Sequence, residues 1–241
     1  MFSFLTPKKR AENPVHIDIH SHLLPGLDDG VESYEDTVAI LKVFESLGYD
    51  KVITTPHIMS DFYKNSPQTI LPALAKTREY IQDKTSIQLF AAAEYYLDET
   101  FISLLEQKED LLTLGNAYLL FETSFMAEPV YLKEAIFKIQ SRGLKPVLAH
   151  PERYQYLHNN WDLVEDLQNR GTFFQLNLNS ISGYYSPAVK KMAKKLINSQ
   201  FIHFFGSDCH HPAHMEVFEK SLKEPIFDKL AKLDLLNNSL V

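Results

Sequence analysis

Seven short apolar segments, separated by helical patterns, constrain the fold of this chain more than any other feature. The segments cover residues 15–19, 51–57, 87–94, 117–122, 145–150, 172–179 and 201–208. Helical patterns lie between them at residues 33–47, 67–84, 98–110, 129–143, 160–170 and from 186 onward, with Ser33 and Ser186 as expected N-caps and Pro129 as an expected first helical residue. Near-continuous apolar strands that alternate with helices are typical of a parallel sheet covered by helices.

The polar ends of these segments distinguish two parallel architectures. In a closed β/α barrel, functional groups lie at the carboxyl ends of several strands. An open doubly wound sheet is expected to gather them at one switch point. Six of the seven segments here end on, or within a few residues of, His, Asp or Glu, so we expect an α/β barrel. Residues 1–14 are expected to be an N-terminal arm and residues 15–241 a single domain, because no linker or repeat divides them.

Charge and cysteine content exclude several classes of protein. The net charge is −7, so a nucleic acid is not an expected partner. The single cysteine, Cys209, excludes an intrachain disulfide and a thiolate metal cluster. A cysteine-dependent phosphatase needs an arginine six residues after its nucleophile, where this chain has Met215. No apolar run reaches the roughly 18 residues that span a bilayer, and the N-terminus lacks the charge order of a secretion signal. We therefore expect a cytoplasmic protein with no membrane span.

The residues at the strand ends form a candidate metal site. His20 and His22 stand two apart on an extended segment and so point the same way, and Asp29 follows in a loop. The candidates are five imidazoles and four carboxylates: His20, His22, Asp29, His57, Glu94, Glu122, His150, Asp208 and His210. These are too many for one cation with its roughly four to six ligands, so we expect a multinuclear site. The donor set suits Zn²⁺, Mn²⁺ or Fe and argues against Ca²⁺, which prefers oxygen ligands.

The motifs around these residues resemble those of the PHP superfamily of metal-dependent phosphoesterases. Within it, the chain is similar to the bacterial tyrosine-protein phosphatases of capsule and exopolysaccharide operons. The matching motifs are Asp-Ile-His-Ser-His (18–22), Asp-Asp-Gly (28–30), Thr-Pro-His (55–57), Ala-Glu-Tyr (93–95), Phe-Glu (121–122), Ala-His-Pro-Glu-Arg-Tyr (149–154) and Ser-Asp-Cys-His (207–210). They follow one another in order from residue 15 to about residue 215.

This resemblance implies a distorted (β/α)7 barrel of the PHP type that holds three divalent ions, usually manganese in this branch, with Fe or Zn²⁺ as alternatives. One ion would be held by His20, His22, Glu94 and Asp208. A second would be held by Glu122, His150 and the bridging Glu94, and a third by Asp29, His57 and His210. Glu94 and Arg153 are the implied catalytic residues, with Arg153 gripping the phosphoryl group bidentately while water activated by the metals attacks phosphorus.

The resemblance also implies the substrate, a phosphorylated tail of a tyrosine kinase that regulates polysaccharide export. One departure weakens this reading: the branch carries a second arginine after the final Asp-x-His, whereas residues 209–215 here contain none. His211, His214 or Lys64 could replace it. Three alternatives stay open: a small-molecule phosphatase acting on histidinol phosphate or a nucleotide, a non-catalytic module that binds phosphotyrosine tails, and a metal-dependent amide hydrolase. The sequence is compatible with a homo-oligomer, although no segment of it marks a subunit interface.

Overall fold

The computed structural model describes residues 13–107, 110–115 and 117–240. Residues 1–12 of the expected N-terminal arm therefore lie outside the described residues. The named strands are parallel throughout and form two sheets. The smaller has the order β1 (Ile17–Asp18), β2 (Lys51–Thr54), β4 (Gln88–Ala91); the larger has the order β3 (His57–Ile58), β5 (Glu94–Tyr96), β6 (Tyr118–Glu122), β7 (Lys145–Ala149), β8 (Phe173–Asn177), β9 (Phe204–Gly206). The predicted α/β class with parallel strands is confirmed.

The second and third expected strands are each divided in two, which the sequence analysis did not anticipate. The second becomes β2 and β3, and the third becomes β4 and β5. Pro56 lies at the first division and has no N–H to donate to a neighbouring strand. Pairing nevertheless continues, because the Glu94 N–H donates to the Pro56 carbonyl at 3.2 Å. As a result, His57 and Glu94 open the strands β3 and β5 instead of closing longer ones.

The expected helices lie close to their predicted positions. The helices of the structure are α1 (Tyr34–Ser46), α2 (Pro67–Ile81), α3 (Glu99–Gln107), α4 (Leu132–Ser141), α5 (Gln155–His158), α6 (Trp161–Asn169), α7 (Asn179–Ser182), α8 (Pro187–Asn198), α9 (Pro212–Ser221) and α10 (Phe227–Leu230), with short 3-10 turns at Pro151–Arg153 and Asn237–Ser239. The two short helices α5 and α7 were not expected. The Ser33 and Ser186 side chains cap α1 and α8 as predicted. The prediction that Pro129 opens α4 is wrong: its carbonyl accepts from the Leu132 N–H in a turn that precedes the helix.

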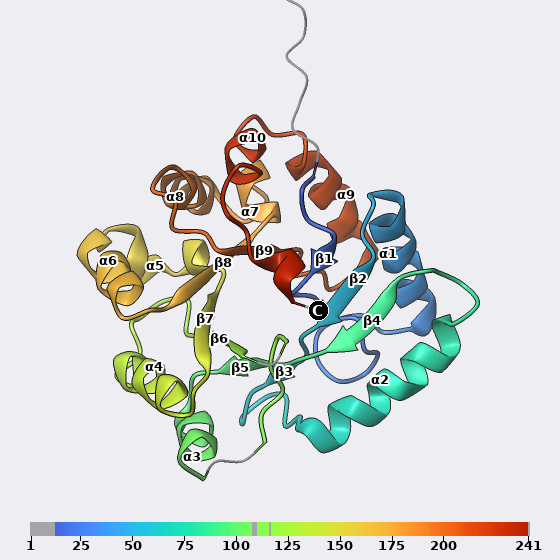
Figure 1. Cartoon of the computed structure of the whole chain (residues 1–241), viewed down its shortest axis with the longest axis horizontal. Helices are drawn as coiled ribbons and strands as arrows, with labels where there is room; N and C mark the ends of the chain where they lie inside the picture. The colour runs from blue at the N-terminus through green and yellow to red at the C-terminus, as the bar shows by residue number, and fades with distance from the viewer. Residues whose placement is uncertain (1–12, 108–109, 116, 241) are drawn as a thin grey trace, which may run out of the picture.

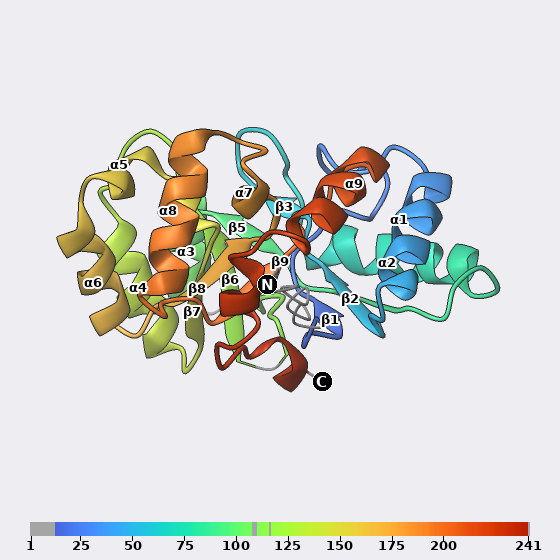
Figure 2. The ribbon, with the colours of Figure 1, turned by 90° about the horizontal axis from the view of Figure 1, so that it is seen from above.

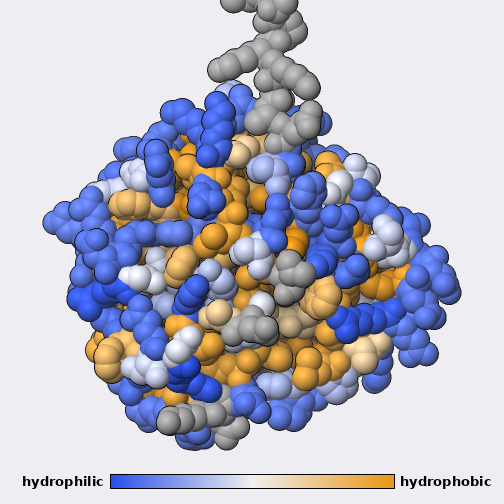
Figure 3. Space-filling view, viewed as in Figure 1, coloured by the Kyte–Doolittle hydropathy of each residue, from blue (hydrophilic) through white to orange (hydrophobic). Residues whose placement is uncertain are grey.

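The helices lie outside the strands (Figure 1). Figure 2 shows the sheet of β1 and β2 beside α1 and α2, and the strands β5 to β9 beside α3 to α8. One apolar core fills the space between strands and helices and includes Phe44, Phe121 and Phe174. A second cluster, which includes Ile19 and Phe204, lies among the strands themselves. On the face shown in Figure 3, hydrophilic residues dominate the outline and apolar residues show nearer the centre.

The final segment is fastened to the strands at the end of the molecule opposite the loop that follows β3 (Figure 2). The Asn237 side-chain amide donates to the carbonyls of Ile17 and Phe205, at 3.0 and 2.7 Å. Its carbonyl oxygen accepts from the Phe205 N–H at 3.2 Å. In the part of the chain that the structure describes, none of the helices is both long enough and apolar enough for a bilayer crossing.

Candidate metal centre

The predicted ligands lie at or near one end of the strands. His20 and His22 follow β1, Glu122 closes β6, His150 follows β7, and Asp208 and His210 follow β9, whereas His57 and Glu94 open β3 and β5, and Asp29 lies in the loop between β1 and α1. His20, His22 and Glu94 have no exposed surface, and Asp29 is the most exposed, with 53 % of its side chain accessible. Segments far apart in the chain thus deliver their imidazoles and carboxylates to one place.

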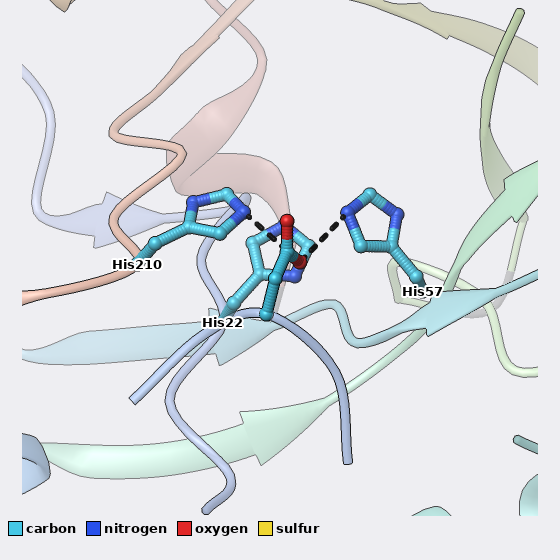
Figure 4. Close-up of side chains that lie close together, drawn as sticks. His22, His57 and His210 are labelled. Carbon is cyan, nitrogen blue, oxygen red and sulfur yellow. Dashed lines mark ion pairs between the residues drawn. The ribbon is translucent and has the colours of Figure 1, made fainter. Parts of the chain in front are cut away.

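All nine predicted ligands belong to groups whose donor atoms lie within 4.8 Å of one another, among the residues that the structure describes. The four groups are His22, Asp29, His57 and His210; His20, His22 and Asp208; His20, Glu94 and His150; and His57, Glu94 and Glu122. His22 thus lies with Asp29, His57 and His210, the residues that the family resemblance implies for the third ion. Glu94 belongs to two of the groups. Figure 4 shows the rings of His22, His57 and His210 gathered around one point, where the Asp29 Oδ1 lies 3.6 Å from the Nε2 atoms of His57 and His210.

Unusual backbone geometry accompanies the cluster. His150 and Asp208 have φ angles of 32° and 50°, in the left-handed region that side-chain-bearing residues rarely adopt. Gly30 is required beside His22, because a Cβ there would lie 2.2 Å from the His22 carbonyl oxygen. A Cβ at Gly206 would lie 2.7 Å from the Cβ of His20. Strain and close approach therefore concentrate where the ligands meet, a pattern found at functional sites.

Asp28 orients one of the buried imidazoles, a role that the sequence analysis did not assign. The Nδ1–H of His22 donates to Asp28 Oδ2 at 2.7 Å, so its Nε2 faces the cluster. The same oxygen accepts from the His57 N–H at 3.0 Å, and Oδ1 accepts from the Gly30 N–H at 3.0 Å. Burial opposes ionisation of Asp28, but the charge of His22 outweighs it and holds the pKa of this carboxyl well below its usual range. The position of Asp28 beside Asp29 in the Asp-Asp-Gly motif was the available signal.

Gln175 plays the corresponding part for His20. Its side-chain oxygen accepts from the His20 Nδ1–H at 2.9 Å and from the His150 N–H at 3.2 Å. This bond fixes the His20 tautomer, so that Nε2 faces Glu94 at 3.0 Å. Gln175 and Asn177 are two apart on β8 and therefore point to the same side. Two polar residues at this spacing in an apolar strand were a signal that the sequence analysis did not use.

The charges of the cluster favour its occupation by cations. Burial disfavours the charged form of His20, but Glu94 and Asp208 outweigh it and raise its pKa to about 9. Burial also opposes ionisation of Glu94 and Asp208, yet the charge of His20 keeps the pKa of both carboxyls well below the usual range. Burial and the nearby charge of His22 lower the pKa of His210 to about 4. Buried carboxylates thus persist as anions, which protons or metal ions must neutralise.

The donor atoms fit divalent ions. Imidazole and carboxylate together suit Zn²⁺, Mn²⁺ and Fe. The Nδ1 atom of His150 is buried and has no hydrogen-bond partner among the described residues. The Nδ1 atom of His57 lies 3.1 Å from Glu122 Oε1 and 3.3 Å from Glu94 Oε2. The two oxygens of Glu94 face different imidazoles, Oε1 lying 3.1 Å from His150 Nε2 and Oε2 lying 3.0 Å from His20 Nε2. A carboxylate placed in this way suits a ligand shared by two ions.

Arg153 lies beside the cluster, and its guanidinium contacts two aromatic rings. The guanidinium carbon is 4.6 Å from the ring centroid of Phe125 and 4.4 Å from that of Tyr185. Its Nη1 donates to Asp208 Oδ2 at 2.9 Å, and the Asn177 amide donates to the same oxygen at 2.8 Å. Cation–π contacts with both rings restrain the guanidinium. No sequence signal marked Phe125 or Tyr185 for this role.

A cavity of about 680 Å³ opens over the site. Arg153 and the predicted ligands Asp29, His57, Glu122, His150, Asp208 and His210 line it. His211 and His214, two of the candidates to replace the second arginine, line it as well, whereas Lys64 does not. The His214 Nδ1 accepts from the His210 N–H at 3.2 Å and its Nε2–H faces the Tyr184 hydroxyl at 3.2 Å, so this ring braces the loop after β9. Of the three candidates to replace the second arginine, His211 is therefore the one that is both exposed and part of the cavity lining.

The comparison with known proteins agrees with this site. Residues 16–220 match the family described as "Capsular polysaccharide synthesis, CpsB/CapC". The chain is 29% identical over 195 residues to the putative tyrosine-protein phosphatase CapC of Staphylococcus aureus, covering 80% of this chain and 76% of that protein. It is 28% identical over 196 residues to the tyrosine-protein phosphatase YwqE of Bacillus subtilis (strain 168), covering 81% and 77%.

A solved structure extends the likeness to the fold. It comes from work on YwqE from Bacillus subtilis and CpsB from Streptococcus pneumoniae, described as unique metal-dependent tyrosine phosphatases. The match has a TM-score of 0.78 and 26% sequence identity, and it covers 92% of this chain and 94% of that one. The family match spans most of the chain and includes every predicted ligand. This chain belongs to the CpsB/CapC family of capsular polysaccharide synthesis.

Proposed function

We propose that this protein is a metal-dependent phosphatase that hydrolyses phosphotyrosine on a protein substrate. The observation that carries the proposal is the position of Arg153, which shares one cavity with six of the nine predicted ligands. A guanidinium suits the oxygens of a phosphoryl group, and a cluster of divalent ions suits their charge. The names of the relatives from Staphylococcus aureus and Bacillus subtilis support the same activity.

In this proposal the cluster holds three divalent ions, with Mn²⁺ as the first candidate. The ligands would be His20, His22, Asp29, His57, Glu94, Glu122, His150, Asp208 and His210, with Glu94 as the bridge. The ions would lower the pKa of water and offset the charge of the phosphate during in-line attack. Arg153 would bind two phosphoryl oxygens with the N–H groups that Asp208 does not occupy. Contacts with the rings of Phe125 and Tyr185 would restrain the guanidinium.

The proposed substrate is a phosphorylated tail of a tyrosine kinase that regulates polysaccharide export, in the cytoplasm. An open cavity of about 680 Å³ suits a phosphorylated side chain on a flexible segment. The family description, capsular polysaccharide synthesis, supports the process.

We also infer that residues 15–241 form one domain, a distorted barrel of seven strands in which β2 with β3 and β4 with β5 each count as one divided strand. Support comes from a parallel bridge between Ser21 and Cys209, which links the segment after β1 to the segment after β9. The Asp208 N–H donates to the His20 carbonyl at 2.7 Å beside this bridge. The apolar cluster among the strands is a further support, because the interior of a small barrel is filled with side chains.

The proposal is tested with metal-stripped protein to which Mn²⁺, Zn²⁺ or Mg²⁺ is restored in turn. A phosphotyrosine peptide and histidinol phosphate serve as substrates, and Arg153→Ala is measured beside the unaltered protein. We expect metal-dependent hydrolysis of the peptide that Arg153→Ala reduces by about 10²-fold or more. Hydrolysis of histidinol phosphate but not of the peptide would show that the protein is a phosphatase for small molecules and not for phosphotyrosine. Metal binding without hydrolysis of either substrate would contradict a phosphatase.

A further inference from the structure

Two strongly exposed apolar side chains stand at the mouth of the cavity. Phe62 is 71% exposed and Met126 is 67% exposed, and both line the same cavity as Arg153. We call this pair the apolar rim. Exposed large apolar side chains are common singly, but two that line one functional cavity mark a candidate contact surface for what enters it.

Phe62 is presented by a rigid turn that is fastened to the candidate metal site. The N–H groups of Met59 and Tyr63 each donate to the other residue's carbonyl at 2.9 Å, which closes the turn around Phe62. The Ser60 N–H donates to Asp98 Oδ2 at 3.1 Å and fastens the turn to the loop after β5. The ring of Tyr63 stacks on that of His57, with centroids 5.6 Å apart. A turn whose backbone is held in this way needs little ordering when Phe62 binds a partner.

Met126 is held in a comparable way on the segment after β6. Its N–H donates to the Ser124 hydroxyl at 3.3 Å. The carbonyl of the preceding Phe125 accepts from the Gln155 N–H at 2.8 Å, and the Phe125 ring contacts the Arg153 guanidinium. Each rim residue is therefore next in sequence to an aromatic residue that contacts the site. A phosphotyrosine bound at Arg153 would therefore share one cavity with both rim residues.

The charges of the cavity favour an apolar occupant at the rim. Arg153 is the only lysine or arginine among the described residues that line the cavity, and it already pairs with Asp208. Asp29 contributes an exposed carboxylate. Apart from Arg153 and the candidate metal centre, which the phosphoryl group would occupy, the described lining offers no lysine or arginine to acidic residues that flank a phosphotyrosine. Phe62 and Met126 would be desolvated by apolar flanking residues.

We propose that the apolar rim binds large apolar side chains next to the phosphotyrosine of a peptide substrate and so determines which tyrosines are dephosphorylated. The inference rests on the proposed phosphotyrosine phosphatase activity and names the sequence that this activity prefers. When the side chain of a phosphotyrosine extends into the cavity, the peptide backbone lies at the cavity mouth. Neighbouring residues of an extended chain are about 3.3 Å apart, so residues within a few positions of the phosphotyrosine meet the rim.

The test measures kcat/KM for phosphotyrosine peptides that carry Leu or Ser at each of the three positions on either side. We expect Leu to be preferred about tenfold at one position or more, the factor given by partial burial of one large apolar side chain. Phe62→Ser and Met126→Ser should each reduce this preference. The matched control is Phe137→Ser on α4, since Phe137 is 69% exposed and does not line the cavity. It should keep the full preference.

The outcomes separate the two claims. Equal hydrolysis of Leu and Ser peptides by the unaltered protein would overturn the inference and leave the phosphatase assignment standing. A preference that Phe137→Ser lowers as much as Phe62→Ser does, or a preference for acidic flanks, would also overturn it. Failure to hydrolyse any phosphotyrosine peptide with metals present would overturn the proposed function itself.

Discussion

Replacing Asp28 by asparagine should weaken metal binding although Asp28 is not itself a predicted ligand. The carboxylate accepts three hydrogen bonds, from the His22 Nδ1–H at 2.7 Å, the His57 N–H at 3.0 Å and the Gly30 N–H at 3.0 Å. In Asp28→Asn, the new side chain would offer one oxygen to these three donors, and its NH₂ group would face at least one of them. The ring of His22 would therefore lose its charge-assisted partner or its orientation.

The magnitude follows from the contacts that are lost. Removing the carboxylate that orients a metal-binding histidine reduces metal affinity by about 10- to 100-fold, which corresponds to about 1.4 to 2.7 kcal/mol. The measurement is the dissociation constant for Mn²⁺, obtained by competition with a chromogenic chelator. Circular dichroism would verify that the variant is folded.

A matched control separates this effect from the loss of any carboxylate that accepts backbone hydrogen bonds. Asp98 also accepts two backbone hydrogen bonds, from Ser60 at 3.1 Å and Phe101 at 2.7 Å, yet it contacts no predicted ligand. Asp98→Asn should bind Mn²⁺ as the unaltered protein does. If Asp28→Asn also kept the affinity of the unaltered protein, the account of His22 as a ligand oriented by Asp28 would be refuted.

Four further predictions follow from the same contacts. Arg153→Lys keeps the charge but loses the fork and the guanidinium contacts with the two rings, so kcat/KM for a phosphotyrosine peptide should fall about 10- to 100-fold. The pKa of His20 is raised to about 9 in the metal-free protein and a ligand must be neutral, so Mn²⁺ affinity should rise from pH 6 to pH 9, with proton release measurable by calorimetry in buffers of different ionisation enthalpy. Burial raises the pKa of the Cys209 thiol, so Cys209→Ala should retain phosphotyrosine hydrolysis. Ser186→Ala removes the cap of α8 and should lower the free energy of unfolding by about 1 kcal/mol in urea titrations.

Those features of the fold that depend on local pattern were predictable. The strands and helices follow from apolar periodicity, and the caps at Ser33 and Ser186 follow from local hydrogen bonding. The division of two strands between two sheets depends on how neighbouring strands continue past Pro56, which is a tertiary property. The start of α4 was misplaced, because Pro129 suits the first position of a turn as well as that of a helix.

In the candidate site, too, some residues could be predicted from local sequence and others could not. The nine predicted ligands could be named because strand ends and motifs mark them, and the structure brings them together. The supporting residues were missed, because their roles arise from packing between distant segments. Gln175 reaches His20 across 155 positions of sequence. Tyr185 meets Arg153 only because the segment between α7 and α8 lines the cavity. The assignment of His22 to two groups likewise depends on three-dimensional placement.

The central claim is that this cluster of imidazoles and carboxylates binds the divalent ions of a phosphatase. The most direct measurement is an anomalous difference map, recorded at the manganese edge from crystals grown with Mn²⁺. We predict three peaks within the cluster, with Glu94 contacting two of them and Arg153 facing the cavity beside them. The absence of peaks at these residues, or peaks held by other side chains, would contradict the account.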